Sequence, residues 1–253
     1  MSVTVGKLFD LLNNLAPVAL AEEWDNVGLL AGHPDKPVET VLCALDLSLP
    51  VLAEAEALGA QLIVTHHPIL FRGRKNLRED DAEGRMLCAL VRANIALIAM
   101  HTNYDNAYPG VNDALARTLG LRDVEVLEEG MRVGVTDAGN LRVFAERAEA
   151  ALGGVIRRYG DPDAAVRRVA VLGGAGEDFI PVAMAAGADV YLTGEMAYHK
   201  GTGAAENGLC VLEAGHAATE HPGILALSAA LQKAADDVQY KIRVLDSKAG
   251  LYL

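Results

Sequence analysis

Aromatic side chains are scarce in this chain, which limits how its interior can be built. Phe, Trp and Tyr make up 5% of the 253 residues, and there is a single tryptophan, Trp24. Hydrophobic residues still account for 51% of the sequence, so Ala, Val and Leu must fill a sizeable globular core. The length suits two compact domains or one large one.

Cysteine is also rare, and its positions do not suggest a metal or disulfide framework. The three residues, Cys43, Cys88 and Cys210, lie in apolar stretches without metal-ligand spacing. An odd number of core-like cysteines predicts reduced thiols. The N-terminal apolar stretch is broken by Lys7 and Asp10, unlike a signal peptide. No run approaches the ~18–20 apolar residues of a membrane helix, so we expect a cytoplasmic protein without membrane contact.

Positive charge is in the minority, because 22 Lys and Arg stand against 34 Asp and Glu, a net charge of −12. Such a surface repels a nucleic-acid backbone, and no nucleic-acid partner is expected. A local basic pocket would still be compatible with one nucleotide. The sequence contains no Gly-Lys-Ser/Thr motif, which argues against a phosphate-binding P-loop.

One pattern of strand, turn, helix, Gly-Ala and strand occurs twice along the chain. Residues 38–65 align without a gap with residues 166–193, at a constant offset of 128. Gly59 and Gly187 fall where a helix end needs the left-handed conformation. We interpret the repeat as an internal duplication that gives an α/β fold of two related, interlinked lobes. We expect lobes at about 1–125 and 126–253, with a final strand near 238–244 that returns to either lobe.

The most informative motif is His66-His67, which follows the buried strand 61–65 and precedes Pro68. On an extended chain, neighbouring side chains point to opposite faces, so we expect the two imidazoles to diverge. The alternative is a strand end with two hydrogen-bonded histidines. Histidine is the commonest metal ligand, and the position at a strand end favours metal binding.

A histidine followed four residues later by a carboxylate occurs after two further strands. His216 and Glu220 have the spacing that places both on one helix face, and they are either metal ligands or a surface pair. His101 and Asp105 repeat this arrangement. Asp105 is either a ligand or the start of the helix from Val111. His101 is either a ligand, a donor behind the ligands or a proton carrier. Because ligands of α/β folds gather at the carboxyl ends of strands, we expect the metal site between the lobes.

Other residues near the strand ends allow alternative interpretations. Glu195 and His199 are either a polar loop or groups that contact substrate and move protons. The segment from Trp24 to Gly28 either covers the site or anchors the exit of the first helix. Gly173, Gly174 and Gly176 lack the spacing of a dinucleotide-binding loop, and we interpret them as a turn.

Taken together, these motifs resemble the dinuclear-metal-centre hexameric protein family, the GTP cyclohydrolase 1 type 2 homologues, over nearly the whole chain. The resemblance implies a homohexamer whose metal sites face an internal cavity. It also implies two divalent metal ions per subunit (Zn, Fe, Mn or Co), with Glu220 bridging them. The implied ligands are His66, His67, Asp105, His216 and Glu220.

Two functions are compatible with these residues. The first is metal-dependent hydrolysis of a nucleotide or related small molecule. In the cyclohydrolase reaction, activated water attacks C8 of guanine and the opened ring releases formate. His101, Glu195 and His199 are the candidate proton carriers. The second is a non-catalytic metal-binding, metal-delivery or regulatory protein with protein partners. A purely structural role for the histidines is the third interpretation.

Overall fold

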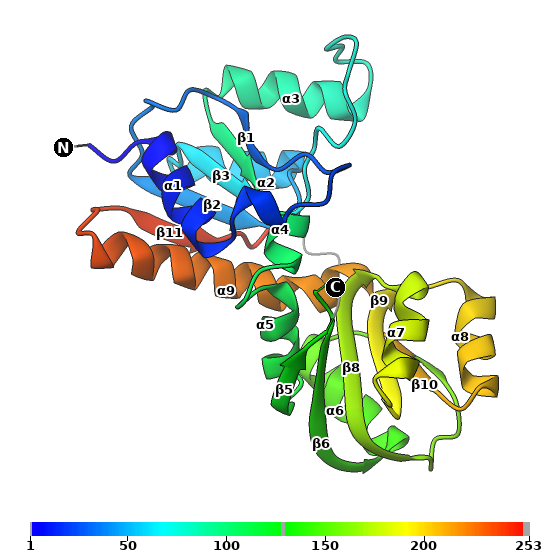
Figure 1. Ribbon diagram of the computed structural model, residues 1–253. Coiled ribbons are helices and arrows are strands. Elements are labelled where there is room, and N and C mark those ends of the chain that lie inside the picture. Colours follow the sequence, from blue (N-terminus) through cyan, green and yellow to red (C-terminus); the bar gives the residue numbers. More distant parts are fainter. Residues whose placement is uncertain (1, 128–129, 250–253) are drawn as a thin grey trace. The chain divides into compact units, whose positions relative to one another are not determined.

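The protein divides into two compact units. The computed structural model describes residues 2–127 and 130–249, and Figure 1 shows its elements. Unit 1 comprises the described residues up to Tyr108 and those from Ile224 to residue 249. Unit 2 comprises the described residues from Pro109 to Gly223. The second change of unit falls inside one helix, α9 (His216–Asp237).

Unit 1 is built on a five-stranded sheet with the order β1-β4-β3-β2-β11. The edge strand β1 is antiparallel to β4, whereas β4, β3, β2 and β11 are parallel to one another. Besides its part of α9, its elements are α1 (Val5–Leu15), η1 (Val18–Leu20), β1 (Gly28–Ala31), β2 (Thr40–Ala44), α2 (Leu49–Ala57), β3 (Leu62–Thr65), α3 (Ala82–Arg92), β4 (Ala96–Ala99), α4 (Thr102–Asp105) and β11 (Arg243–Asp246).

The central strands of unit 1 are covered on both faces, as expected of a parallel sheet. All residues of β2, β3 and β4 are buried. Leu42, Ile63 and Leu97 pack with α2 and α3 in one apolar cluster. Cys43 points to the opposite face, where it contacts Ser228 of α9. Burial raises the pKa of the Cys43 thiol to about 12, so it is a protonated core residue.

Unit 2 contains a six-stranded mixed sheet with the order β5-β6-β8-β9-β10-β7. Strands β8, β9 and β10 are parallel, and the other pairs are antiparallel. Besides the start of α9, its elements are α5 (Val111–Thr118), β5 (Arg122–Val126), β6 (Arg132–Asn140), α6 (Leu141–Leu152), β7 (Arg157–Tyr159), β8 (Ala165–Ala175), η3 (Glu177–Phe179), α7 (Ile180–Ala185), β9 (Val190–Glu195), α8 (Tyr198–Glu206) and β10 (Cys210–Glu213).

The sheet of unit 2 separates two apolar clusters, because its side chains alternate between faces. Val169 and Val171 pack with α5 and α6, whereas Ala170 and Leu172 pack with α7 and α8. The buried Arg132 places α5, since its Nε and Nη2 donate to the carboxylate of Asp113 at 2.8 and 2.7 Å.

The internal duplication predicted from the sequence is confirmed by strand register. In unit 1, Val41 pairs with Leu62 and Ala44 pairs with Thr65. In unit 2, the residues 128 positions later form the same pairs, from Val169 with Val190 to Leu172 with Thr193. The helix ends also agree, because Gly59 and Gly187 have φ of +66° and +67°. The predicted fold class of two related α/β lobes is therefore correct.

The bounds of the units differ from the lobes expected at 1–125 and 126–253. Contacts place the first change of unit at Tyr108, and α9 carries the chain from unit 2 back into unit 1. The final strand is β11, shorter than the segment 238–244 suggested. It pairs with β2, from Arg243 with Thr40 to Asp246 with Cys43, so the strand returns to the first unit.

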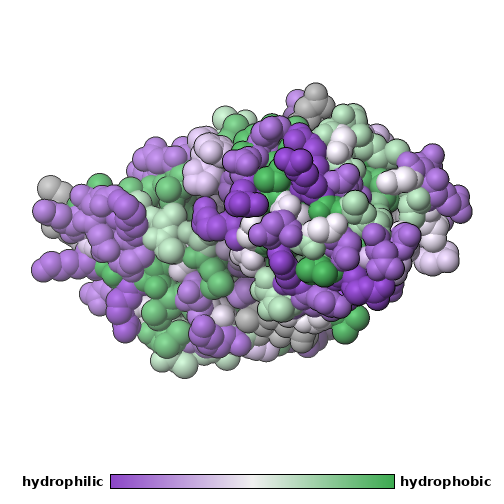
Figure 2. Space-filling view, turned by 90° about the horizontal axis from the view of Figure 1, so that it is seen from below, coloured by the Kyte–Doolittle hydropathy of each residue, from purple (hydrophilic) through white to green (hydrophobic). Residues whose placement is uncertain are grey.

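The surface combines polar residues with dispersed apolar ones. Figure 2 shows a face on which hydrophilic residues are interrupted by several hydrophobic areas. Within the described ranges, none of the helices has the length and apolar character that crossing a membrane requires.

Candidate metal centre

The polar residues of unit 1 gather where its parallel strands end. Strands β2, β3 and β4 run in the same direction, so their carboxyl ends lie at one edge of the sheet. Asp46 follows β2, His66 and His67 follow β3, and His101 follows β4. As the sequence predicted, these candidate residues follow the carboxyl ends of the parallel strands of unit 1.

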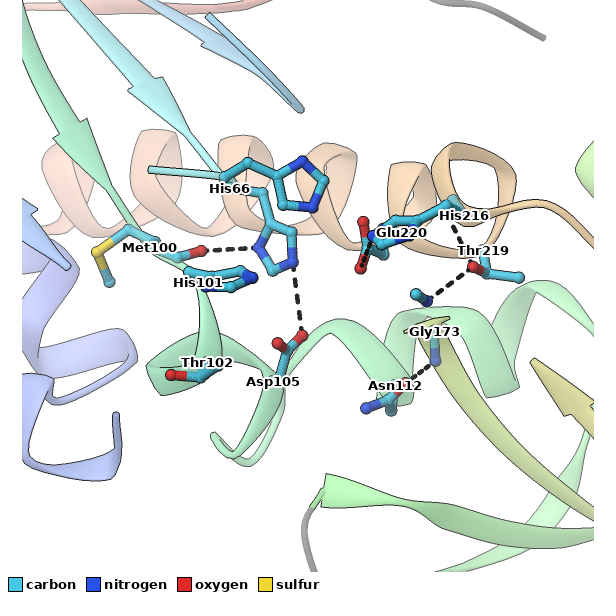
Figure 3. Close-up of polar contacts among 12 residues, drawn as sticks. His66, Met100, His101, Thr102, Asp105, Asn112, Gly173, His216, Thr219 and Glu220 are labelled. Carbon is cyan, nitrogen blue, oxygen red and sulfur yellow. Dashed lines mark hydrogen bonds and ion pairs between the residues drawn. The ribbon is translucent and has the colours of Figure 1, made fainter. Parts of the chain in front are cut away.

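His66 is fully buried and its tautomer is fixed by the backbone. Its Nδ1 lies 2.8 Å from the carbonyl oxygen of Met100, and a carbonyl can only accept, so Nδ1 carries the hydrogen. In the neutral ring, Nε2 is then the nitrogen with the lone pair. This atom lies 3.6 Å from Oδ1 of Asp105, as drawn in Figure 3. A lone-pair nitrogen and a carboxylate oxygen facing each other form a donor pair for a cation.

His67 is oriented by a carboxylate, and its ring does not diverge from that of His66. Its Nδ1 lies 2.8 Å from Oδ1 of Asp46, and the two histidine ring centroids are 5.0 Å apart. The expected divergence is therefore wrong. Strand β3 ends at Thr65 and both histidines lie in a bend, so the alternation of an extended chain no longer applies.

His101 is held by Asp25, which belongs to the segment expected to cover the site or to anchor the exit of the first helix. Nδ1 of His101 lies 3.0 Å from Oδ1 of Asp25. The other carboxylate oxygen accepts from the backbone N–H of Thr102 at 3.0 Å and from its hydroxyl at 2.5 Å. Burial acts to raise the pKa of Asp25, but these hydrogen bonds from His101 and Thr102 lower it to about 2. Asp25 is thus an ionised anchor behind the ring.

The three rings of unit 1 form a cluster that could hold a metal ion. His66, His67 and His101 each offer a ring nitrogen, and these atoms lie within 4.8 Å of one another. Each Nδ1 is turned towards a carbonyl or carboxylate oxygen. Partners of this kind fix the orientation and tautomer of metal-binding histidines. The residues present therefore fit a divalent cation of the nitrogen- and oxygen-binding type.

In unit 2, His216 lies between two carboxylates. It opens α9, as its sequence position predicted. Its Nε2 is 3.1 Å from Oε1 of Glu220, one turn along the helix, and its Nδ1 is 3.3 Å from Oε2 of Glu195. The predicted pairing of His216 with Glu220 on one face is confirmed (Figure 3). Glu220 is buried, so its carboxylate is taken out of water.

The diglycine Gly173-Gly174 makes room for that carboxylate. The sequence suggested a turn, but both residues lie inside β8, where the pairing with β9 shifts after Leu172. Gly174 has φ of +69°, and a Cβ there would collide with Oε1 of Glu220. A Cβ on Gly173 would lie 3.2 Å from Cγ of Glu220. The strand needs glycine here because backbone and carboxylate approach each other closely.

Side chains from two helices hold the diglycine in place. The backbone N–H of Gly173 donates to Oδ1 of Asn112 at 2.8 Å, and that of Gly174 donates to the hydroxyl of Thr219 at 3.1 Å. Both bonds are drawn in Figure 3. Asn112 belongs to α5 and Thr219 to α9. Neither residue was singled out from the sequence, because their partners are backbone groups far along the chain.

The repeated motif of histidine and carboxylate does not superimpose as the sequence suggested. Ala96 pairs with Leu62 in unit 1, and Cys210 pairs with Val190 in unit 2. This register makes His101 the counterpart of Gly215, one residue before His216. The expected equivalence of His101 and His216 is wrong by one position, because His101 is the N-cap of α4 whereas His216 is the first residue of α9. The spacing to the following carboxylate cannot detect this shift.

The two remaining candidates are Asp105, whose carboxylate faces His66, and His199. Asp105 is the last residue of α4, and the N-cap of α5 is Gly110. The interpretation of Asp105 as the start of the helix from Val111 is therefore wrong. His199 lies in α8, and within the described part of unit 2 no hydrogen bond or ion pair joins its side chain to Glu195, His216 or Glu220.

Fold and cluster together define a class, a two-unit α/β protein whose histidines suit a divalent metal ion. The chain belongs to the Duf34/NIF3 (NGG1p interacting factor 3) family, whose model matches residues 3–249. This membership confirms the resemblance drawn from the sequence motifs.

Similar proteins span nearly the same length as this chain. A GTP cyclohydrolase 1 type 2 homolog of Streptomyces coelicolor is 39% identical over 96% of this chain and 91% of its own. One from Clostridium perfringens is 34% identical over 92% and 95%. A crystal structure of a Bacillus cereus protein related to NIF3 has a TM-score of 0.93 and 26% identity, with 100% of both chains covered.

Asp25→Asn tests the anchor behind His101. We expect metal affinity to fall by about 10- to 100-fold, because a neutral amide holds the ring less firmly than a carboxylate does. Isothermal titration with Zn²⁺ and Mn²⁺ measures the change. Asp10→Asn, at an exposed position of α1, should bind as the unchanged protein does. Equal affinities in both variants would show that Asp25 has no part in metal binding.

Gly174→Ala tests the space made for Glu220. The added Cβ forces Glu220 away from its position and imposes a strained positive φ. We expect the free energy of unfolding to fall by about 1–3 kcal/mol, with weaker metal binding. Thermal unfolding and metal analysis measure both effects. The control, Gly203→Ala, adds a Cβ into open space on a helix and should not destabilise the protein.

Proposed function

We propose that the protein is a cytoplasmic, metal-dependent hydrolase of the GTP cyclohydrolase type, acting on a nucleotide or a related small molecule. Two observations support the proposal. The histidine cluster of unit 1 fits a divalent cation, and close relatives carry the name GTP cyclohydrolase 1 type 2 homolog. We further propose two ions per subunit, Zn, Fe, Mn or Co, bound by His66, His67, Asp105, His216 and Glu220.

The observation that carries the metal-binding part is the common orientation of three imidazoles. Each Nδ1 is turned towards an oxygen of the protein, at 2.8–3.0 Å. A structural histidine needs no such arrangement in triplicate, whereas a metal ligand does, because the second nitrogen must keep its lone pair and its direction. This argues against a purely structural role for the cluster.

The chain's own residues would bring proton transfer and orientation to the reaction. When bound, divalent cations polarise a substrate oxygen and lower the pKa of water. His101 is the third ring of the cluster but not one of the five proposed ligands, so its Nε2, on a ring held by ionised Asp25, is the first candidate proton carrier. Glu195 is exposed and lies beside His216, so it is a second candidate acid or base. We keep His199 as a third, on its sequence position alone.

Release of formate from GTP tests the hydrolase proposal. Protein loaded in parallel with Zn, Mn, Fe or Co should turn GTP over, and His216→Ala and Glu220→Ala should lower the rate about a hundredfold or more. His33→Ala is a matched control, since His33 is exposed and its one ion pair among the described residues is with Asp35. It should retain the full rate.

The alternatives to this proposal give different results. Full turnover by Glu220→Ala with metals bound normally would show that the proposed metal mechanism is wrong. Tight metal binding without turnover of GTP or other nucleotides would favour a non-catalytic metal-binding or metal-delivery protein. Such a protein should transfer its metal to an acceptor that lacks it, which a competition assay with a metal indicator would detect.

We also propose that the protein is a homohexamer, as the family resemblance implies. Light scattering should then give a mass six times that of the 26.7 kDa chain. A monomer or dimer at the concentrations used for turnover would contradict this. Light scattering should precede the turnover measurements, because a variant with an altered oligomeric state must be identified before its rate is interpreted.

A further inference from the structure

An open cavity lies close to the histidine cluster within unit 1. It has a volume of about 570 Å³ and is lined by Asn26 and by residues of the segment from Leu70 to Leu77. That volume is within the range of small-molecule sites. The ring of Phe71, one of the lining residues, lies 6.4 Å from the ring of His101. A ligand on Phe71 would therefore lie next to the predicted reacting groups.

Two exposed aromatic rings lie at or beside the cavity although aromatic residues are scarce in the chain, because Phe71 lines the cavity and Trp24 contacts Phe71. Trp24 is 59% exposed and Phe71 is 45% exposed. Their centroids lie 5.6 Å apart, and Trp24 lies 6.2 Å from His101. Exposed aromatic faces of this kind are the usual platform for a stacked base. The pair therefore favours a flat, aromatic ligand.

The cavity also contains a cation that has no counter-ion among the described residues. Lys75 lines the cavity and forms no ion pair in the described ranges. Its neighbour Arg74 is engaged elsewhere, because its two Nη atoms pair with Asp81 and Glu83 at 2.6 and 2.7 Å. In a protein of net charge −12, an isolated cation in a cavity favours a negatively charged ligand.

The walls of the cavity are fixed before any ligand arrives. Besides its ion pairs, Arg74 donates from Nε to the carbonyl oxygen of Asn76 at 3.2 Å. At the other end of the segment, Nδ2 of Asn26 donates to the carbonyl oxygen of Leu70 at 2.6 Å. A segment held at both ends loses little entropy when a ligand binds.

We propose that this cavity is the nucleotide subsite, with the base stacked on Phe71, the inclined ring of Trp24 at the edge of the base, and the phosphates at Lys75. The inference rests on the proposed function, which supplies the reason to look for a nucleotide. The aromatic pair contacts His101 and Lys75 does not, so the base is the end presented to the histidines. That is the orientation needed for chemistry on the base. The ligand class is therefore a nucleoside phosphate.

The single tryptophan makes the inference directly measurable. GTP mixed rapidly with the metal-loaded protein should quench Trp24 fluorescence, because the base stacks beside it. Lys75→Ala should weaken GTP binding about tenfold and leave guanosine binding unchanged, since guanosine has no phosphate. Phe71→Ala should weaken both ligands about tenfold. Lys241→Ala, which removes an exposed lysine of unit 1, is the matched control and should change neither.

Three results would overturn the inference. They are unaltered GTP binding in Lys75→Ala, absence of quenching by GTP, and a changed mass of Phe71→Ala in light scattering with unaltered GTP affinity. The last would show that the aromatic pair is an interface between copies of the chain. Phe71→Leu, which keeps the apolar volume, separates loss of stacking from loss of folding and should also weaken both ligands.

Failure of this inference differs from failure of the hydrolase proposal. If the variants change GTP affinity as expected but no formate is released, the subsite proposal is supported and the hydrolase proposal is contradicted. If Lys75→Ala releases formate with an unchanged KM for GTP, the hydrolase proposal is supported and the subsite proposal is contradicted.

Discussion

Parallel strand pairing in a shared register is the constraint on which the other features depend. In both units, two strands linked by a helix pair in the same register, and equivalent residues of the two units are 128 positions apart along the chain. A third strand, β4 in one unit and β10 in the other, extends each pair in the same direction. Because parallel strands end at one edge of a sheet, the residues that follow the strands lie close together in the fold although they are far apart in the sequence. His66, His101 and His216 all occupy such positions.

Much of this arrangement could be predicted from the sequence, because it depends on periodicity and on residues with restricted conformations. The repeat, the left-handed Gly59 and Gly187, and the helix start at His216 are features of this kind. The orientation of the histidines could not be predicted. It depends on Asp25 and Asp46, which lie 76 and 21 residues from their partners. Only the folded chain brings such groups together.

The errors concern residues at or near the carboxyl ends of strands. His67 was expected to alternate with His66, but the chain leaves the extended conformation after Thr65. Gly174 was expected in a turn, but it continues a strand with a positive φ. His101 was aligned one residue too far, because it is the N-cap of α4 whereas His216 is the first residue of α9. In each case, local preference gave way to packing around polar groups.

The order of the two units along the chain also determines which sheet can be completed first during translation. Among the residues that the structure describes, unit 2 is one continuous stretch, whereas unit 1 is assembled from both sides of it. The sheet of unit 1 cannot be completed until β11 has been made and has paired with β2, some 200 residues after β2 itself. The inserted unit therefore has all its strands available first, as the chain leaves the ribosome. Until β11 has been made, the backbone groups of β2 that pair with β11 have no partner strand, and exposed strand edges of this kind favour pairing with other chains.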